Sequence, residues 1–167
     1  EFGECQYEKG SDGKMLFYLT NPNIVSLVYT RTDWSPRNLL DSIAMCDDYD
    51  ALIDTGALIT NMSNIEVARY LLEKIDPKRK DGVVYIDEDG RKMIALRSSG
   101  GKVVPLEQCG LAARRRFAFY DQVHTTGMDI KHSINANAVL TLSKSLTFRD
   151  FAQGAFRMRG IGRGQRV

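Results

Sequence analysis

The sequence has few of the residues that build disulfide frameworks or metal cages. It contains three cysteines, Cys5, Cys46 and Cys109, and two histidines, His124 and His132. The odd number of cysteines, their wide spacing and the lack of a Cys-x-x-Cys pair argue against a disulfide scaffold and a zinc ribbon. We therefore expect no structural metal, and reduced thiols in an intracellular protein, cytoplasmic or nuclear.

The chain also lacks long apolar runs and a dominant charge. No run approaches the ~20 apolar residues that a membrane-spanning helix needs, and no basic-then-apolar signal pattern is visible, so no membrane association is expected. The net charge of +2 does not indicate a general nucleic-acid binder. With 167 residues, 43% of them hydrophobic and 26% charged, the composition is that of one folded domain, with or without an appendage.

Strand-like and helix-like patterns alternate along the chain. Helices are predicted to begin at Ser35-Pro36 and at the Ser63–Glu66 capping box, and a third is predicted over 148–158. Strands are predicted at 14–20, 24–30, 50–54, 83–87, 91–97, 117–120 and 138–142. We expect an α/β fold with a mostly parallel sheet and helices on both faces. Ligands should then lie beyond the carboxyl ends of strands, after Asp54, Tyr120 and Leu142.

One strand leads into Asp54-Thr55-Gly56-Ala57. Three apolar residues followed by Asp-Thr-Gly-Ala are similar to the active-site motif of retroviral-type aspartic proteases, in which two carboxylates share a proton. The capped helix that starts within ten residues does not suit that family, which continues in β-structure. An aspartic protease using Asp54 is therefore kept as a lesser alternative, beside a plain strand and glycine turn.

Two later motifs form an ordered pair. Residues 125–130 (TTGMDI) follow a predicted strand, and residues 153–165 contain Gln153 and several arginines. In this order, with a strand between them, they resemble motifs V and VI of the second RecA-like lobe of superfamily 2 helicases and translocases. The resemblance implies a RecA-like three-layer sandwich over residues 35–167, with residues 1–34 as an extension containing one or two strands. It also implies that Gly127, Asp129 and Gln153 face a nucleotide.

The resemblance leaves the arginine finger open among three residues. Gln153 and Arg157 fit the Gln-x-x-x-Arg spacing of the family, whereas its second arginine would fall at Gly160, between Arg159 and Arg163. An arginine supplied by a second lobe stabilises the charge that develops on the γ-phosphate. Arg157 is favoured as the finger, Arg159 is its competitor, and Arg163 is a further nucleotide contact.

The parts of a first motor lobe are missing. The sequence has neither the phosphate-binding Gly-x-x-x-x-Gly-Lys-Ser/Thr loop nor an acidic Asp-Glu-x-Asp metal-binding box. We therefore expect ATP and Mg²⁺ to bind only together with a first RecA-like lobe of the same protein. The chain is then a fragment of a longer protein, inactive alone.

A broader resemblance covers roughly residues 50–165. These residues look like part of a very large, poorly characterised eukaryotic family with a helicase-like nucleotide-binding region, some of whose members are described as ubiquitinyl hydrolases. The residue types themselves suggest a catalytic triad of Cys109 and His124 with Asp121 or Asp129. The broader resemblance adds weight to this alternative, a thiol-dependent ubiquitinyl hydrolase. A degenerate RecA-like scaffold, whose arginines contact another domain or RNA, is the remaining alternative. Ubiquitin and nucleic acid are accordingly possible partners.

Overall fold

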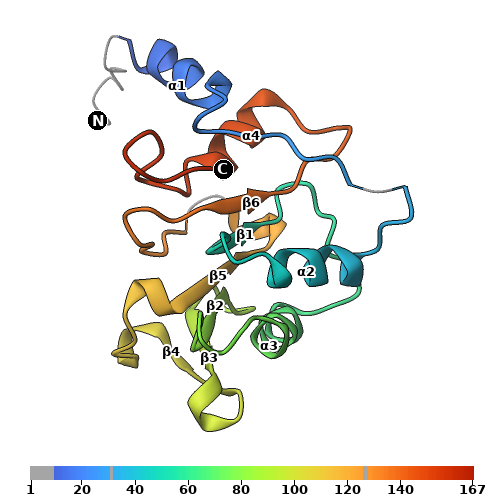
Figure 1. The fold of residues 1–167 in the computed structure, drawn as a ribbon, viewed down its shortest axis with the longest axis vertical. Coiled ribbons are helices and arrows are strands. Elements are labelled where there is room, and N and C mark those ends of the chain that lie inside the picture. The colour runs from blue at the N-terminus through green and yellow to red at the C-terminus, as the bar shows by residue number, and fades with distance from the viewer. Residues whose placement is uncertain (1–9, 31, 126–127) are drawn as a thin grey trace, which may run out of the picture.

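The computed structural model describes residues 10–30, 32–125 and 128–167, which form an α/β fold around a six-stranded sheet (Figure 1). The helices are α1 (Ser11–Thr20), α2 (Pro36–Met45), α3 (Asn64–Lys74) and α4 (Phe148–Ala155). The strands are β1 (Ala51–Ile53), β2 (Gly82–Ile86), β3 (Lys92–Leu96), β4 (Lys102–Pro105), β5 (Arg116–Tyr120) and β6 (Ala138–Leu140). Short 3₁₀ turns are η1 (Arg97–Ser99), η2 (Leu106–Gln108), η3 (Ala113–Arg115) and η4 (Gln122–Thr125).

The sheet has the order β4-β3-β2-β5-β1-β6, and its larger part is parallel. Strands β2, β5, β1 and β6 run in one direction, while β3 and β4 add an antiparallel extension at one edge. The predicted hairpin turn at Asp89-Gly90 joins β2 to β3, where Gly90 adopts the left-handed φ of +75°. The mostly parallel α/β sheet expected from the alternating patterns is confirmed.

Helices pack against both faces of this sheet. Alternate strand residues divide between two apolar clusters: Val84 and Tyr120 belong to the cluster that includes α1 and α4, and Val83 and Phe119 belong to the cluster that includes α2 and α3. Because the central strands are buried on both faces, they are continuously apolar and show no polar alternation. Each fully buried side chain of this size contributes about 1.5–3 kcal/mol to the free energy of folding.

Within the described ranges, no helix has both the length and the apolar character needed to span a bilayer.

Local capping explains where two of the predicted helices begin. The Ser35 side chain accepts a hydrogen bond from the Asn38 N–H at 3.1 Å, and Pro36 occupies the first helical position of α2. At α3, Ser63 and Glu66 form the predicted capping box, in which the Glu66 carboxylate accepts from the Ser63 N–H at 2.7 Å. These two helix starts are confirmed.

The first two predicted strands are wrong. Residues 14–20 lie in α1, and residues 24–30 form no strand of the sheet. Met15, Tyr18 and Leu19 are spaced as one face of a helix, and all three pack against the α1/α4 cluster. Residues 24–30 have the composition of a strand, but their strand-like pairing is limited to two backbone hydrogen bonds. Val167 donates its N–H to the Ile24 carbonyl and accepts the Ser26 N–H. The predicted helix over 148–158 ends earlier, at Ala155.

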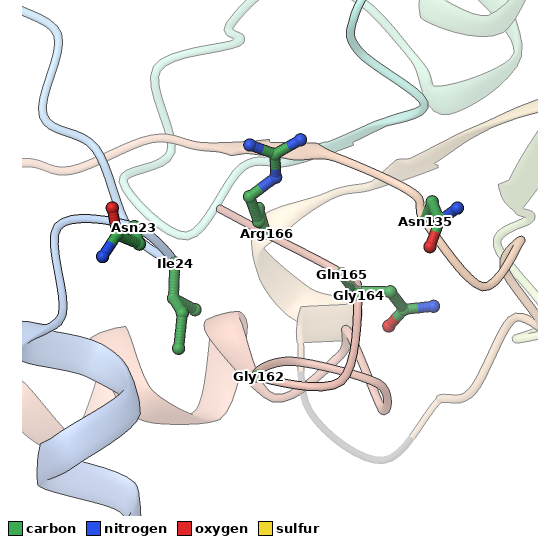
Figure 2. A pocket seen from close by; sticks show the side chains of 7 residues that line it. All are labelled: Asn23, Ile24, Asn135, Gly162, Gly164, Gln165 and Arg166. Atoms are coloured by element: carbon green, nitrogen blue, oxygen red, sulfur yellow. The ribbon is translucent and has the colours of Figure 1, made fainter.

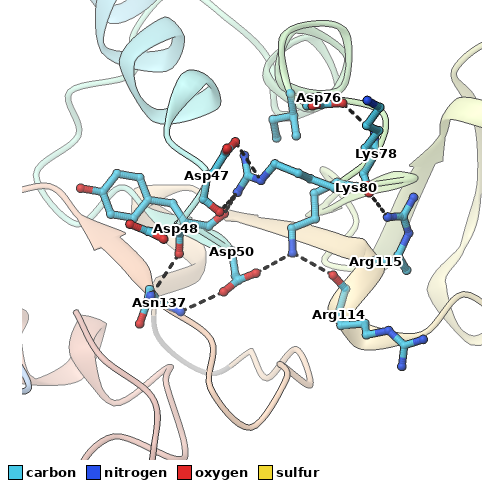
Figure 3. Close-up of polar contacts among 12 residues, drawn as sticks. Asp47, Asp48, Asp50, Asp76, Lys78, Lys80, Arg114, Arg115 and Asn137 are labelled. Atoms are coloured by element: carbon cyan, nitrogen blue, oxygen red, sulfur yellow. Dashed lines mark hydrogen bonds and ion pairs between the residues drawn. The ribbon is translucent and has the colours of Figure 1, made fainter.

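A buried ion pair joins the amino ends of the parallel strands (Figure 3). Lys80, which precedes β2, is 4% exposed, and its ammonium group contacts the Asp50 carboxylate at 2.5 Å and the Arg114 carbonyl at 2.9 Å. Asp50, which precedes β1, also accepts the backbone N–H of Asn137 at 3.0 Å, just before β6. The network therefore fixes the starts of β1, β2, β5 and β6 relative to one another.

Candidate functional site

The chain that follows α4 contains a buried arginine. Arg157 is 9% exposed, and its Nη1 donates to the carbonyl of Met128, in the segment that resembles motif V. Its Nε is buried without a hydrogen-bond partner, and no carboxylate in the described part of the chain forms an ion pair with it. Burial, followed by the nearby Arg159 charge, lowers the pKa of Arg157 below its ordinary value. The guanidinium is therefore a buried cation, and the Asp129 charge that acts on it is already paired with Arg159.

The next arginines are exposed. Arg159 Nε lies 3.1 Å from the Asp129 carboxylate, and both side chains are 58% exposed. Arg163 donates to the Arg159 carbonyl at 2.9 Å. Gln153 lies half-buried on α4 and is not bonded to these arginines within the described residues. The structure thus brings Asp129, Arg157, Arg159 and Arg163 together, while the predicted nucleotide contact Gly127 lies outside the described residues.

A polar pair lies near Arg157 in the interior. The Tyr120 hydroxyl is 3.0 Å from His132 Nε2 and accepts the Ile130 N–H at 3.2 Å. Burial raises the pKa of Tyr120 and lowers the pKa of His132 to about 4. The phenol and the imidazole are therefore both neutral near pH 7. Sequence reasoning treated Tyr120 only as part of a buried strand and gave His132 no role.

The glycine-rich turn after Arg159 borders an open hollow of about 430 Å³ (Figure 2). Gly162 has a left-handed φ of +75°, and a Cβ there would lie 2.5 Å from the Tyr18 ring, so this turn requires glycine where α1 packs on it. Asn23, Asn135 and Arg166 line the same hollow. In Figure 2 the Arg166 side chain points away from the Gly162 turn.

Asp54, the candidate protease residue, is a buried structural carboxylate. It is 2% exposed and accepts the Thr141 hydroxyl at 2.6 Å and the backbone N–H groups of Leu58 and Ile59 at 2.9 Å. Thr141 in turn accepts the Gly56 N–H at 2.9 Å. The Asp-Thr-Gly sequence therefore ties the loop after β1 to the loop after β6, in a parallel sheet.

Replacing Gly154 by alanine is expected to destabilise the fold by about 1–3 kcal/mol, because overpacking is costly in a dense interior. A Cβ at Gly154 would lie 2.4 Å from Thr55 Oγ1 and 2.9 Å from Leu140 Cδ1. The measurement is chemical denaturation of the purified chain. Gly13→Ala, in α1, is the matched control and should not destabilise the fold, because nothing lies within 4 Å of its new methyl group and alanine is the better helix former. Equal effects of the two substitutions would contradict this packing account.

The predicted Cys109–His124 pair is not brought together. Cys109 follows η2, and its carbonyl lies 3.4 Å from the Arg116 side chain, at the start of β5. His124 lies in η4, after the end of β5. Five extended residues span about 13 Å between their first and last Cα atoms. Cys109 is half-buried and packs, like Leu106 and Leu111, against the apolar α1/α4 cluster.

His124 instead pairs with Asp121, one of the two acids considered for it. Its Nδ1 lies 2.6 Å from Asp121 Oδ1, and both side chains are 20% exposed. The pair lines a hollow of about 470 Å³ beyond the carboxyl ends of β2 and β5, next to the start of α3. Asp129, the other acid considered, is paired with Arg159. In the described residues, no group of three or more His, Cys, Asp and Glu side chains is placed to hold a metal ion.

No protein-family model matches the chain, and no similar protein is found among curated proteins or among solved structures.

Proposed function

We propose that this chain is the second, RecA-like lobe of an ATP-dependent helicase-like NTPase. It presents Asp129 and the arginines of the 157–163 segment to a nucleotide at a lobe interface, and it is inactive alone. The observation that supports the proposal is that the segment resembling motif V contacts the segment resembling motif VI. Met128 contacts Arg157, and Asp129 contacts Arg159, although each pair is separated by about thirty residues in the sequence.

The charges of this cluster suit a phosphate chain. Two arginines share one carboxylate here, because Asp129 acts on the buried Arg157 and is paired with the exposed Arg159. A phosphate anion would balance this excess positive charge. Guanidinium groups bind phosphate oxygens with strong, directed hydrogen bonds. The residues present therefore fit an anionic ligand at this position.

The two arginines have different parts in this proposal. Arg159 is exposed and held on one side by Asp129, so it is the better candidate to reach a phosphate from a facing lobe. Arg157 holds the Met128 carbonyl from the interior, which fixes the backbone next to Asp129. Mg²⁺ would be held by the first lobe, since the described residues provide no cluster of metal ligands. Closure of the two lobes would then complete the site.

Inorganic tripolyphosphate tests the anion site without requiring the first lobe. At about ten times its Kd it should stabilise the purified chain by about 1.4 kcal/mol, measured as a rise in Tm. Arg159→Ala should weaken binding about tenfold, because a charge-assisted hydrogen bond is lost. Arg149→Ala, an exposed arginine on α4, is the matched control and should leave the Kd nearly unchanged.

Two results would contradict the proposal. One is the absence of any tripolyphosphate effect, or an equal loss in Arg149→Ala and Arg159→Ala, which would mean diffuse attraction to surface charge. The other is steady ATP turnover by the chain alone that is abolished by Arg157→Ala, because the second lobe is proposed to be inactive without the first.

A further inference from the structure

The hollow beside His124 is separate from the arginine cluster and has the opposite charge. Four of its lining residues are carboxylates, Asp87, Glu88, Asp89 and Asp121, and one is an arginine, Arg91. That arginine is already engaged, since its Nη2 lies 2.8 Å from both the Asp87 and the Asp89 carboxylates. The hollow therefore keeps a net negative charge, while no partner bonds Glu88 within the described residues.

A buried tyrosine also lines this hollow. Tyr85 is 3% exposed, and across the described ranges no group forms a hydrogen bond with its hydroxyl. Burial raises the pKa of Tyr85, the Asp87 charge raises it further, and the Arg69 charge opposes this rise. The side chain is enclosed, but its hydroxyl oxygen is not among the fully buried unpaired atoms of the described residues, so it is open to a hydrogen-bonding ligand at the hollow.

Several other polar groups of the hollow offer acceptors to a ligand. Asn64 donates one amide N–H to the Ile86 carbonyl at 2.8 Å, which leaves its side-chain oxygen available as an acceptor and its second N–H available as a donor. His124 Nδ1 is engaged by Asp121, so Nε2 is the ring nitrogen left to face a ligand. Asp121 uses Oδ1 for His124, so its Oδ2 is a further acceptor. The hollow therefore offers several hydrogen-bond acceptors and is complementary to a ligand that has several hydrogen-bond donors.

We infer that this hollow binds a guanidinium group, the side chain of an arginine on a partner protein. A guanidinium carries one positive charge and five N–H donors in a plane, and it has no acceptor, which complements this lining. A metal ion is a poorer occupant, because no three ligating side chains of the described residues are placed to hold one. The volume of about 470 Å³ is within the range of side-chain and small-ligand pockets.

The probe is the peptide acetyl-Gly-Arg-Gly-amide, titrated into the isotopically labelled chain and followed by amide chemical shifts. Saturable shifts should appear at Tyr85, Glu88 and His124. The citrulline peptide, which has the same shape without the charge, should produce no saturable shifts there. The lysine peptide should bind more weakly than the arginine peptide, because an ammonium group has fewer donors.

Three variants locate the binding. Glu88→Gln, on the exposed hairpin, should weaken the Kd about threefold by removing one charge. Tyr85→Phe keeps the ring and removes only the hydroxyl, and it should weaken the Kd about fivefold. Glu73→Gln, an exposed acid on α3 that does not line the hollow, is the matched control and should leave the Kd unchanged.

The inference fails if the arginine peptide causes no shifts at the hollow, or if the citrulline peptide binds equally well. It also fails if Glu73→Gln weakens binding as much as Glu88→Gln, since attraction would then be general. The test uses a cationic probe and residues outside the arginine cluster, so its outcome is independent of tripolyphosphate binding.

Discussion

Replacing Lys80 by alanine is expected to lower the free energy of unfolding by about 2–3 kcal/mol, because its removal leaves the partly buried Asp50 carboxylate without its cation. Lys80 is 4% exposed and bonds both to Asp50 and to the Arg114 carbonyl. Without Lys80, the Asp50 carboxylate keeps its hydrogen bond from the Asn137 N–H but loses its ion pair. Since a domain is stable by only about 5–15 kcal/mol in total, denaturation in urea should show a large fall in the midpoint.

Lys78→Ala is the matched control for this prediction. Lys78 lies two residues earlier in the same loop and its side chain is exposed, so its removal should change stability by less than about 0.5 kcal/mol. The double variant Lys80→Met with Asp50→Asn should recover part of the loss, because neither charge is then left buried and unpaired. If Lys80→Ala were as mild as Lys78→Ala, the ion pair would have no stabilising role.

Local signals in the sequence were sufficient to predict several elements. Ser35-Pro36, the Ser63–Glu66 capping box and Asp89-Gly90 each specify backbone geometry through neighbouring residues alone. The continuous apolar strands required burial on both faces, and this fixed the α/β class. The same reasoning failed for residues 14–20, whose apolar residues fit both a strand and one helix face. Residues distant in the sequence form the α1/α4 cluster, and packing against this cluster favours the helix over the strand.

Only those residues of the candidate site that belong to the two ordered motifs could be named from the sequence. The resemblance named Asp129 and the arginines 157, 159 and 163, and the structure places all four in one cluster. It could not show that Arg157 is buried, because arginine is ordinarily exposed and its burial depends on contact with a distant loop. The Cys109–His124 pairing was an inference from residue types, and β5 separates the two positions.

Lys80 gave no signal in the sequence for a comparable reason. Within Lys78-Arg79-Lys80-Asp81 it looks like part of a charged surface loop. Its burial arises because four parallel strands begin side by side, which brings Asp50 and Arg114 to it. Polar contacts of Lys80 and Asp50 join the amino ends of the strands, whereas the hollow lined by Tyr85 and His124 lies beyond the carboxyl ends of β2 and β5.

The second large effect is expected from His132, whose burial should make the fold sensitive to mild acid. Burial lowers its pKa from an ordinary 6.5 to about 4, opposed by the charges of Asp50 and Asp129 and reinforced by that of Lys80. Between these two pH values the unfolded chain binds a proton at this residue and the folded chain does not. The free energy of unfolding should therefore fall by about 3 kcal/mol from pH 6.5 to pH 4, at about 1.4 kcal/mol per pH unit.

His132→Gln isolates this contribution, because glutamine does not titrate and keeps an amide that can bond to the Tyr120 hydroxyl. Urea denaturation at several pH values should show a weaker loss of stability below pH 6.5 in the variant than in the parent chain. Carboxylates whose pKa is lowered in the fold, such as Asp81 with Arg115 and Asp150 with Thr147, also lose their stabilising contacts in acid. They are present in both chains, so the difference between the two pH profiles belongs to His132. Parallel profiles would mean that the imidazole is free to take up a proton in the folded state.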